Sequence, residues 1–408
     1  MMHQVLVVED SRAYQNYLTQ QLRQAGFDVI CAQSLTDARQ ILAQKPKLLC
    51  AVLDYCLPDA QDGEIIDWVL RNNHRVIVLT ATFNEAVREQ VLAKGVVDYI
   101  LKDSMASVSY LLPLVNRLRD NHNHNHKALI VDDSFTVRNH ITHLLNQQYI
   151  TTLEAENGQQ AIELLQQHSD ISFIITDHDM PVKDGISMIR EIRTTYSPSQ
   201  LAILGLSGSE DRTMTAQFLK AGANDFLYKP FNQEELFCRI HQLLEMKEAH
   251  LAMYRLANQD ALTGLWNRRY LFNQSCPSLC ASRSVAMLDI DFFKKVNDNY
   301  GHDVGDSAIR TIANILKIYF PDDVVARFGG EEFCVQSCAR FDEFTQRLES
   351  VRSRVEKTPV THGELKIPLT ISIGASNSTG SLEQQIKSAD ERLYHAKENG
   401  RNRVVFEL

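Results

Sequence analysis

Two sets of three carboxylates have a spacing that would let them act together on a metal ion and a phosphoryl group. In the first set, Glu9 and Asp10 follow one apolar run and Asp54 ends another. The second set has the same spacing and consists of Asp132, Asp133 and Asp177. Mg2+ prefers carboxylate oxygens, and an aspartate beside such an ion can attack phosphorus. Each set therefore predicts one Mg2+ ion and one phosphoacceptor.

A hydroxyl and a lysine follow each set. Thr80 and Lys102 are 22 residues apart, and so are Ser207 and Lys229. A lysine can pair with an acyl phosphate while a hydroxyl moves to contact its oxygens. The added charge can then bias a two-state surface.

A third group of acids lies near the C-terminus. Asp289 follows the apolar run 284–288, and Glu331 and Glu332 follow a Gly-Gly pair between two strand-like runs, which predicts a hairpin. These carboxylates could hold Mg2+ against a triphosphate, and glycines allow close approach of backbone to phosphate. Gly-Gly-Glu-Glu alone also fits a plain polar hairpin. Its combination with the 289–298 segment favours catalysis.

An internal repeat positions the first two sets. Residues 4–10 and 127–133 are both apolar runs that end in two acids, and each is followed 44 residues later by the aspartate that ends another run. Amphipathic stretches at 13–25 and 185–194 predict helices between the strands. The pattern predicts two doubly wound parallel sheets, whose ligand sites lie at the C-terminal strand ends.

The repeat also divides the chain. The predicted parts are a first repeat domain (1–121), a polar linker (122–126), a second repeat domain (127–245), a long connecting helix (232–258) and a third domain (259–408). The alternate histidines of the linker could bind a metal, but a polar linker without helix or strand is the favoured interpretation. In the long helix, residues at steps of four and three predict a coiled-coil seam for a second copy; a monomeric linker is the alternative. These residues are Ile240, Leu244, Lys247, Leu251 and Tyr254.

Both repeats resemble response-regulator receiver domains. The resemblance implies phosphorylation of Asp54 and Asp177 by cognate histidine kinases, and Tyr99 and Phe226 stand where the family keeps its switch aromatic. The first repeat departs from the family pattern in two places. Asp103 replaces the proline found at Pro230, and the loop 57–63 is one residue longer. Either receiver could alternatively serve only as an adaptor or dimer surface.

Residues 259–408 resemble the GGDEF domains, the diguanylate cyclases, in the Gly-Gly-Glu-Glu-Phe form. The resemblance implies a palm-like α/β fold related to nucleotide cyclases. It implies that two Mg2+ ions are held by Asp289, the Ile290 carbonyl, Glu331 and Glu332. It assigns catalysis to Glu331, Lys294 and Glu332. Substrate binding falls to Phe292, Phe293, Asn297, His302, Asp306, Gly329, Gly330, Lys397 and Arg401.

The implied reaction joins two GTP molecules into cyclic di-GMP with release of two pyrophosphates. Asp306 could accept hydrogen bonds from the guanine edge, which adenine cannot donate. One domain holds one GTP, so catalysis requires a homodimer that brings two such domains together.

One inhibitory feature of the family is incomplete. Many members have an Arg-x-x-Asp motif just before the signature, and here Phe320 replaces the arginine while Asp323 remains. Phenylalanine lacks the planar donors with which arginine binds guanine and phosphate. We expect weak or absent feedback inhibition at this position.

Composition sets the remaining limits. A hydrophobic content of 44% and a charged content of 23% are typical of globular domains. The net charge of −9 argues against a nucleic-acid partner. The N-terminal apolar run is short and lacks a basic leader, which predicts a cytoplasmic protein without membrane insertion. Two other functions stay open, a catalytically inactive sensor of GTP or cyclic di-GMP and a scaffold response regulator; GTP turnover separates both from a cyclase.

Overall fold

The computed structural model describes residues 3–60, 63–81, 84–102, 106–208, 212–273, 283–362 and 365–407. Asp103 and part of the loop 57–63 lie outside these ranges. The chain forms two compact units, Met1–Glu248 and Ala249–Leu408, and we describe each by itself. Among the described residues, no helix is long and apolar enough to cross a membrane.

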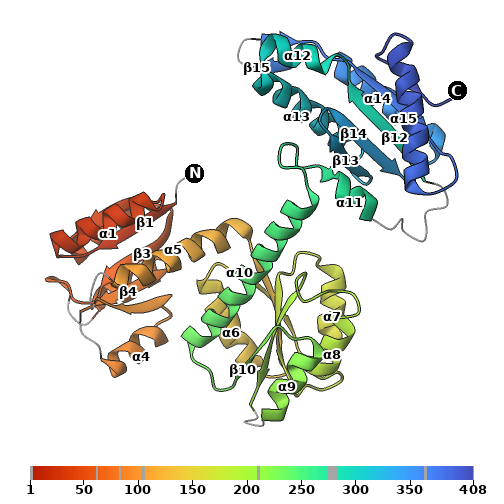
Figure 1. Ribbon diagram of the computed structural model, residues 1–408. Helices are drawn as coiled ribbons and strands as arrows, with labels where there is room; N and C mark the ends of the chain where they lie inside the picture. The colour runs from red at the N-terminus through yellow and green to blue at the C-terminus, as the bar shows by residue number, and fades with distance from the viewer. Residues whose placement is uncertain are drawn as a thin grey trace. The chain divides into compact units, whose positions relative to one another are not determined.

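The first repeat is a five-stranded parallel sheet with helices on both faces (Figure 1). Val5 and Val7 pack toward α1 and α5, whereas Leu6 and Val8 face the opposite core, as expected for a strand buried on both sides. The strand order is β2-β1-β3-β4-β5. The elements are β1 (Gln4–Val8), α1 (Arg12–Gln24), β2 (Asp28–Ala32), α2 (Leu35–Ala43), β3 (Leu48–Asp54), α3 (Glu64–Arg71), β4 (Val76–Thr80), α4 (Glu85–Ala93), β5 (Asp98–Leu101) and α5 (Ala106–His124).

The second repeat has the same topology, with strand order β10-β9-β8-β6-β7. In both repeats the strand order reverses beside the first strand, and ligands bind at such a switch point in open α/β sheets. The elements are β6 (Lys127–Val131), α6 (Phe135–Gln147), β7 (Thr151–Ala155), α7 (Gly158–Gln167), β8 (Phe173–Asp177), α8 (Gly185–Ile192), β9 (Ala202–Ser207), α9 (Arg212–Ala221), β10 (Asp225–Tyr228) and α10 (Gln233–Asn258).

The connection between the repeats differs from the predicted polar linker. Helix α5 continues through His124, and only two residues separate it from β6. The predicted linker, residues 122–126, has no glycine or proline to stop the helix earlier. Asn125 ends it instead, in a left-handed conformation with φ of 49°, which asparagine tolerates better than most residues.

The predicted seam of α10 is only partly open to a second copy. Ile240 and Leu244 are buried in the core of the second repeat, so they cannot contact a second copy. Leu251 and Tyr254, later in the same predicted seam, are 39% and 43% exposed. Exposed residues at steps of three, four and three instead follow one another on the same helix: Met246, Ala249, Met253 and Leu256. A heptad pattern is therefore present, but on a different face from the one expected.

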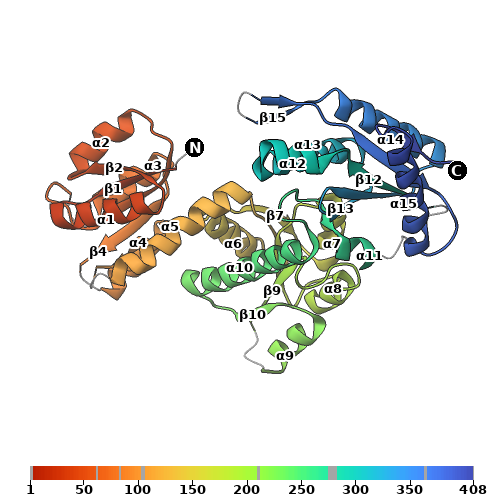
Figure 2. The same cartoon turned by 45° about the horizontal axis from the view of Figure 1, so that its top comes forward.

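The third domain contains a mixed six-stranded sheet, ordered β11-β13-β14-β12-β17-β18, and a separate hairpin of β15 and β16 (Figure 2). Helices α12, α13 and α14 cover one face and α11 and α15 the other. The elements are β11 (Trp266–Asn267), α11 (Arg268–Asn273), β12 (Ser284–Ile290), α12 (Phe293–Tyr300), α13 (His302–Tyr319), β13 (Val324–Gly329), β14 (Glu332–Ser337), α14 (Phe341–Glu356), β15 (Val360–His362), β16 (Leu365–Ile367), β17 (Ile371–Ser376), α15 (Leu382–Glu398) and β18 (Val404–Val405). The predicted fold class is confirmed in all three domains.

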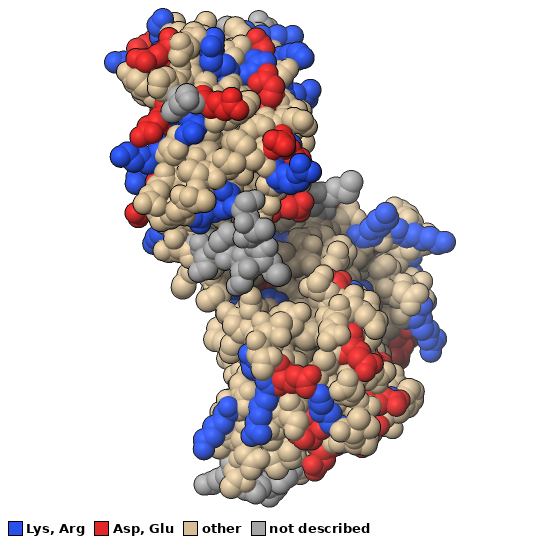
Figure 3. Space-filling view, turned by 90° about the vertical axis from the view of Figure 1, so that its right-hand side faces the viewer, with Lys and Arg blue, Asp and Glu red and all other residues tan. Residues whose placement is uncertain are grey.

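Charged side chains are mixed on the molecular face that Figure 3 draws, with Lys and Arg interspersed among Asp and Glu.

Candidate functional site

The first repeat brings its acids together at the switch point of its sheet. Glu9 directly follows β1, and Asp54 is the last residue of the neighbouring strand β3. Oxygens of Glu9, Asp10 and Asp54 all lie within 4.8 Å of one another. The Lys102 ammonium, just beyond β5, lies 2.7 Å from Glu9 Oε2 and 2.7 Å from Asp54 Oδ2.

Burial shapes the charges of this pocket. Glu9 is 2% exposed, and burial raises the pKa of its carboxyl despite the opposing effect of Lys102. Burial alone would lower the pKa of Lys102, but its hydrogen bonds to Asp54 and Glu9 raise it overall. The pocket therefore holds a charged lysine against the carboxylates in the absence of a metal. Thr80 ends β4 and Tyr99 lies on β5, and both are buried.

The second repeat has an equivalent pocket with slightly different geometry. Oxygens of Asp132, Asp133 and Asp177 also lie within 4.8 Å of one another. Lys229 Nζ lies 2.6 Å from Asp132 Oδ2 and 3.0 Å from Asp177 Oδ1. Burial is the main cause that raises the pKa of Asp177. Ser207 ends β9 and Phe226 lies on β10, and both are buried.

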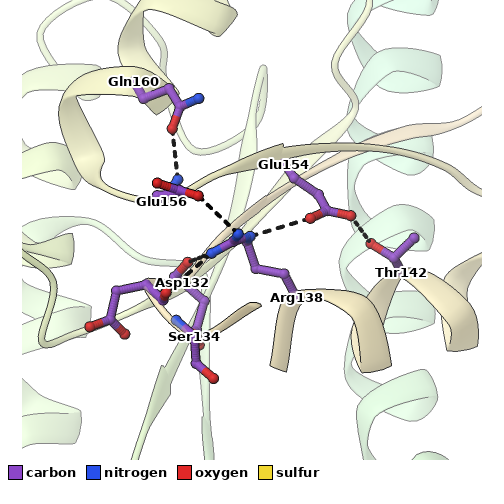
Figure 4. A network of polar contacts seen from close by, with 8 residues as sticks. Asp132, Ser134, Arg138, Thr142, Glu154, Glu156 and Gln160 are labelled. Atoms are coloured by element: carbon purple, nitrogen blue, oxygen red, sulfur yellow. Dashed lines mark hydrogen bonds and ion pairs between the residues drawn. The ribbon is translucent and has the colours of Figure 1, made fainter. Parts of the chain in front are cut away.

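A buried arginine of α6 holds the acidic pair of the second repeat (Figure 4). Arg138 Nη1 donates to the main-chain carbonyls of Asp132 (2.7 Å) and Asp133 (3.2 Å). Its other nitrogens donate to Glu154 (3.2 Å) and Glu156 (3.2 Å) at the end of β7. The network fixes the backbone that carries the acids.

In the third domain, Asp289 of β12 lies directly opposite Glu332 of β14 in the antiparallel register. The predicted hairpin is confirmed: β13 and β14 pair around Gly330, which has φ of 50°. A Cβ at Gly329 or Gly330 would meet nothing within 4 Å, so the turn is open to a ligand. The oxygens of Asp289, Glu331 and Glu332 do not converge as tightly as the receiver acids, although the structure describes all three residues.

A lysine lies against these acids. Lys397 Nζ, near the end of α15, is 2.8 Å from Asp289 Oδ2. Burial first, together with the charges of Glu331 and Asp291, raises the pKa of Asp289 although Lys397 opposes it. Burial first and then the charge of Asp289 raise the pKa of Glu332. Such crowded carboxylates favour an added cation.

The segment after β12 has an unusual backbone. Phe292 has φ of 57°, a conformation that is costly for a bulky residue and is often found at functional sites. Phe292 is 51% exposed, and its ring centroid lies 4.4 Å from the Arg401 guanidinium carbon and 4.6 Å from Lys295 Nζ. Phe293 begins α12 and is buried. Lys294 follows it on the same helix.

Asn297, His302 and Asp306 lie on α12 and α13, which pack against each other. Asn297 Oδ1 is buried and has no hydrogen-bond partner among the described residues. A Cβ at Gly305 would lie 2.0 Å from this oxygen. A side chain at position 305 would therefore force Asn297 to move, so glycine allows α13 to pack closely against this amide.

Two residues that support the site of the third domain were not identified from the sequence. Asp291 is buried and accepts hydrogen bonds from Thr370 Oγ1 (2.8 Å), Ser372 Oγ (2.7 Å) and the Asn402 main-chain nitrogen (3.0 Å). It therefore anchors the turn that presents Arg401. The spacing of acids in the sequence does not distinguish Asp291 from an aspartate that binds a metal.

The second supporting residue is Arg327. Its Nη1 contacts both oxygens of Asp260 (3.2 and 3.1 Å), and its Nε donates to the carbonyl of Gly330 (2.9 Å). Burial tends to raise the pKa of Asp260, but hydrogen bonds from Thr263 and Arg327 lower it. The ion pair thus joins the start of the domain to the Gly-Gly turn.

Comparison with known protein families assigns each part of the chain. A model of the response regulator receiver domain matches residues 5–108 and 128–241. A model described as the diguanylate cyclase GGDEF domain matches residues 257–403. The chain belongs to the response regulators. It carries two receiver domains and a C-terminal GGDEF domain.

Relatives agree with this architecture. The response regulator PleD of Caulobacter vibrioides is 27% identical over 460 residues, which cover 99% of each protein. Diguanylate cyclase A of Treponema denticola is 37% identical over 170 residues, covering 40% of this chain and 46% of that protein. A solved structure of a protein assigned as a two-component system response regulator with a GGDEF domain is 39% identical. It covers 60% of this chain and 99% of its own, with a TM-score of 0.56.

Proposed function

We propose that this response regulator is a diguanylate cyclase that condenses two GTP molecules into cyclic di-GMP as a homodimer under receiver control. The observation that carries the proposal is the juxtaposition of Asp289 and Glu332 across two strands beside the open Gly-Gly turn. In each half-reaction a 3′-oxygen forms a bond to the α-phosphorus of the other GTP, and the bond to the leaving pyrophosphate breaks. Glu331 takes the 3′-hydroxyl proton.

We assign two Mg2+ ions to the oxygens of Asp289, the Ile290 carbonyl, Glu331 and Glu332. All are hard oxygen donors, and the raised pKa values of Asp289 and Glu332 show how crowded the negative charge is without a cation. Bound Mg2+ supplies charge neutralisation for the triphosphate. Lys397, Lys294 and Arg401 contribute further positive charge to the phosphates.

Guanine selection is assigned to the α12–α13 side of the site. The orphaned Asn297 Oδ1 favours a ligand that donates hydrogen bonds, because an unpaired buried oxygen is costly. Asp306 and His302 lie on the adjoining helix. Guanine donates hydrogen bonds from N1 and its 2-amino group, positions at which adenine has no donor, so Asp306 would discriminate strongly against ATP.

The exposed heptad face of α10 supports the homodimer. Met246 and Met253 are 60% and 68% exposed, and Leu256 is 81% exposed. Apolar side chains at this spacing pair well with a second copy of the same helix. Such pairing would raise the local concentration of one GGDEF domain near the other.

We assign control to aspartyl phosphorylation at Asp177 and Asp54, with one Mg2+ ion in each receiver pocket and histidine kinases as the donors. A route toward α10 exists within the receiver unit. Gln233 at the start of α10 donates to the Val97 carbonyl (3.1 Å) of the first receiver, and Glu234 pairs with Arg88. A change at α4 or just before β5 of the first receiver would therefore reach α10 directly.

Feedback inhibition through the Arg-x-x-Asp position should be weak or absent. Phe320 is buried in the domain core, and Arg347 Nη2 lies 2.7 Å from Asp323 Oδ2, so this aspartate already has a cationic partner. We expect Asp323→Ala to leave inhibition by cyclic di-GMP unchanged in a product-titration assay. A clear loss of inhibition in this variant would contradict the assignment.

The proposal is tested by product analysis of purified protein with GTP and Mg2+, using chromatography and mass spectrometry. The wild type should form cyclic di-GMP, and Glu331→Gln should lose at least about 100-fold of the rate, typical for a proton-transfer group. Glu343→Gln on α14 is a matched control that should not differ from wild type. Absence of product at high protein concentration would favour the inactive sensor or the scaffold.

A further inference from the structure

Two histidines and one glutamate lie together where α5, β6 and α10 meet, away from the phosphoacceptor pockets. His124 ends α5, His126 precedes β6, and Glu248 lies on α10. Ligand atoms of the three side chains all lie within 4.8 Å of one another. Residues two apart on one helix would point to nearly opposite sides. The left-handed turn at Asn125 instead brings the two histidine rings to 5.6 Å between centroids.

The distances match coordination better than direct hydrogen bonding. Glu248 Oε1 lies 3.6 Å from His124 Nδ1 and 3.6 Å from His126 Nε2. Hydrogen bonds between such atoms are about 2.7–3.2 Å long. Ligands about 2.0–2.2 Å from a tetrahedral metal ion lie roughly 3.3–3.6 Å apart. The carboxylate oxygen is thus placed as it would be if an ion joined it to each ring.

A neighbouring serine orients the His126 ring for metal binding. Its Nδ1 lies 3.3 Å from Ser172 Oγ, and in the tautomer in which Nδ1 donates this bond, Nε2 carries its lone pair toward Glu248. Histidines that bind metals are commonly oriented by such a partner.

Helix α10 is fixed at the same place. Lys247 Nζ donates to the Ser172 carbonyl (2.8 Å). Ser172, the residue just before β8, therefore contacts both α10 and His126. The side chains of His124 and Glu248 are 56% and 48% exposed, against 12% for His126. Two ligands can therefore adjust to an ion, and a fourth position is accessible to water.

We propose that His124, His126 and Glu248 form a binding site for a divalent transition-metal ion of the zinc class. Two imidazoles and one carboxylate suit Zn2+, whereas Mg2+ prefers oxygen ligands alone. Binding would join the end of α5, the start of β6 and α10. It would hold α10 against the second receiver at the opposite end of β8 from Asp177.

The test measures Zn2+ binding to the full chain by calorimetry, with excess Mg2+ present to occupy the carboxylate pockets. One ion should bind per chain. His126→Ala and Glu248→Gln should each weaken binding by more than about 100-fold, and Ser172→Ala by about 10-fold, as for other residues that orient a ligand. His122→Ala is the matched control, because His122 belongs to the same run of alternating histidines but its ring packs on Tyr149. This variant should bind Zn2+ like wild type.

A second measurement does not depend on the variants. Co2+ bound to the wild-type chain should give the intense visible absorption of a four-coordinate ion, and Zn2+ should raise the thermal unfolding midpoint in a way that a chelator reverses. Equal Zn2+ affinity in wild type and Glu248→Gln would overturn the proposal. A weak six-coordinate Co2+ spectrum would overturn it as well.

Discussion

Asp54 and Asp177 end equivalent strands of the two receiver sheets, but different residues support them. In the second receiver, the charged Arg138 holds the carbonyls of the acidic pair and two glutamates. In the first receiver, the same helix position is the neutral Gln15, which donates to the carbonyls of Glu9 (3.1 Å) and Ala32 (2.6 Å). Similar pocket chemistry can thus rest on a charged or a neutral support, and the two supports should respond differently to mutation and pH.

The lysines also differ. Lys102 lies equally close to Glu9 and Asp54, whereas Lys229 is closer to Asp132 than to Asp177. Asp177 is also more exposed than Asp54, with 14% of its side chain accessible against 8%. Both differences leave Asp177 the easier target for a phosphodonor. We therefore expect the second receiver to be the main input.

The largest expected effect concerns the two phosphoacceptors. Allosteric couplings are typically about 5–150-fold, so we expect beryllofluoride to raise cyclase activity within this range. Asp177→Asn should remove most of the activation, and Asp54→Asn should remove less. The measurement is the rate of cyclic di-GMP formation with and without the mimic. A larger loss in Asp54→Asn would reverse the ranking of the two receivers.

The supporting residues should differ in their effect on stability. Arg138→Ala leaves carbonyls and glutamates without a buried donor and should destabilise the second receiver by about 3 kcal/mol, since hydrogen bonds to charged groups are worth about 1.5–3 kcal/mol. Gln15→Ala should cost the first receiver about 1 kcal/mol. Hydrogen exchange read by mass spectrometry in β6 and β1 resolves the two domains. Equal losses would show that the charge of Arg138 adds nothing.

The stability of the two receivers should depend differently on pH, because the first residues of β5 and β10 have different surroundings. Burial, helped by the charge of Glu234, raises the pKa of Asp98 from 3.8 to about 6, whereas Asp225 is paired with Arg239 at 3.0 Å. The fold thus favours protonated Asp98. Its contribution to stability is full below about pH 4 and is lost as pH rises through about 6, a change on the order of 3 kcal/mol.

Asp98→Asn is neutral at every pH and should remove this dependence from the first receiver, and Asp225→Asn should not. Trp68 lies on α3 of the first receiver, and Trp266 is the second of the two tryptophans in the chain. Fluorescence-monitored unfolding in a Trp266→Phe background therefore reports on the first receiver. An unchanged pH dependence in Asp98→Asn would contradict the assignment.

The sequence predicted the elements whose pattern is local. Apolar strands ending in acids located both receiver sheets and their pockets, and the paired glycines located the hairpin of the third domain. Residues that act through contacts between distant elements were not predicted. Arg138 joins residues of three elements, and Asp291 has the same residue type and strand-end position as a metal ligand but anchors a turn.

Periodicity was also insufficient to say which partner a helix face meets. Ile240 and Leu244 of α10 have the spacing of a coiled-coil seam, but they pack in the receiver core. The same spacing serves both purposes because each requires an apolar stripe along a helix. The alternating histidines likewise gave no sign that a turn at Asn125 would bring two of them together.

The central claim is that the receivers control a cyclase. The most direct test is the rate of cyclic di-GMP formation by the full chain with Mg2+ and GTP, with and without beryllofluoride, in wild type and in the Asp54→Asn/Asp177→Asn double variant. The account predicts product that increases with the mimic in wild type and does not change in the double variant. Equal activation of both proteins, or no response of the wild type, would contradict control by the receivers.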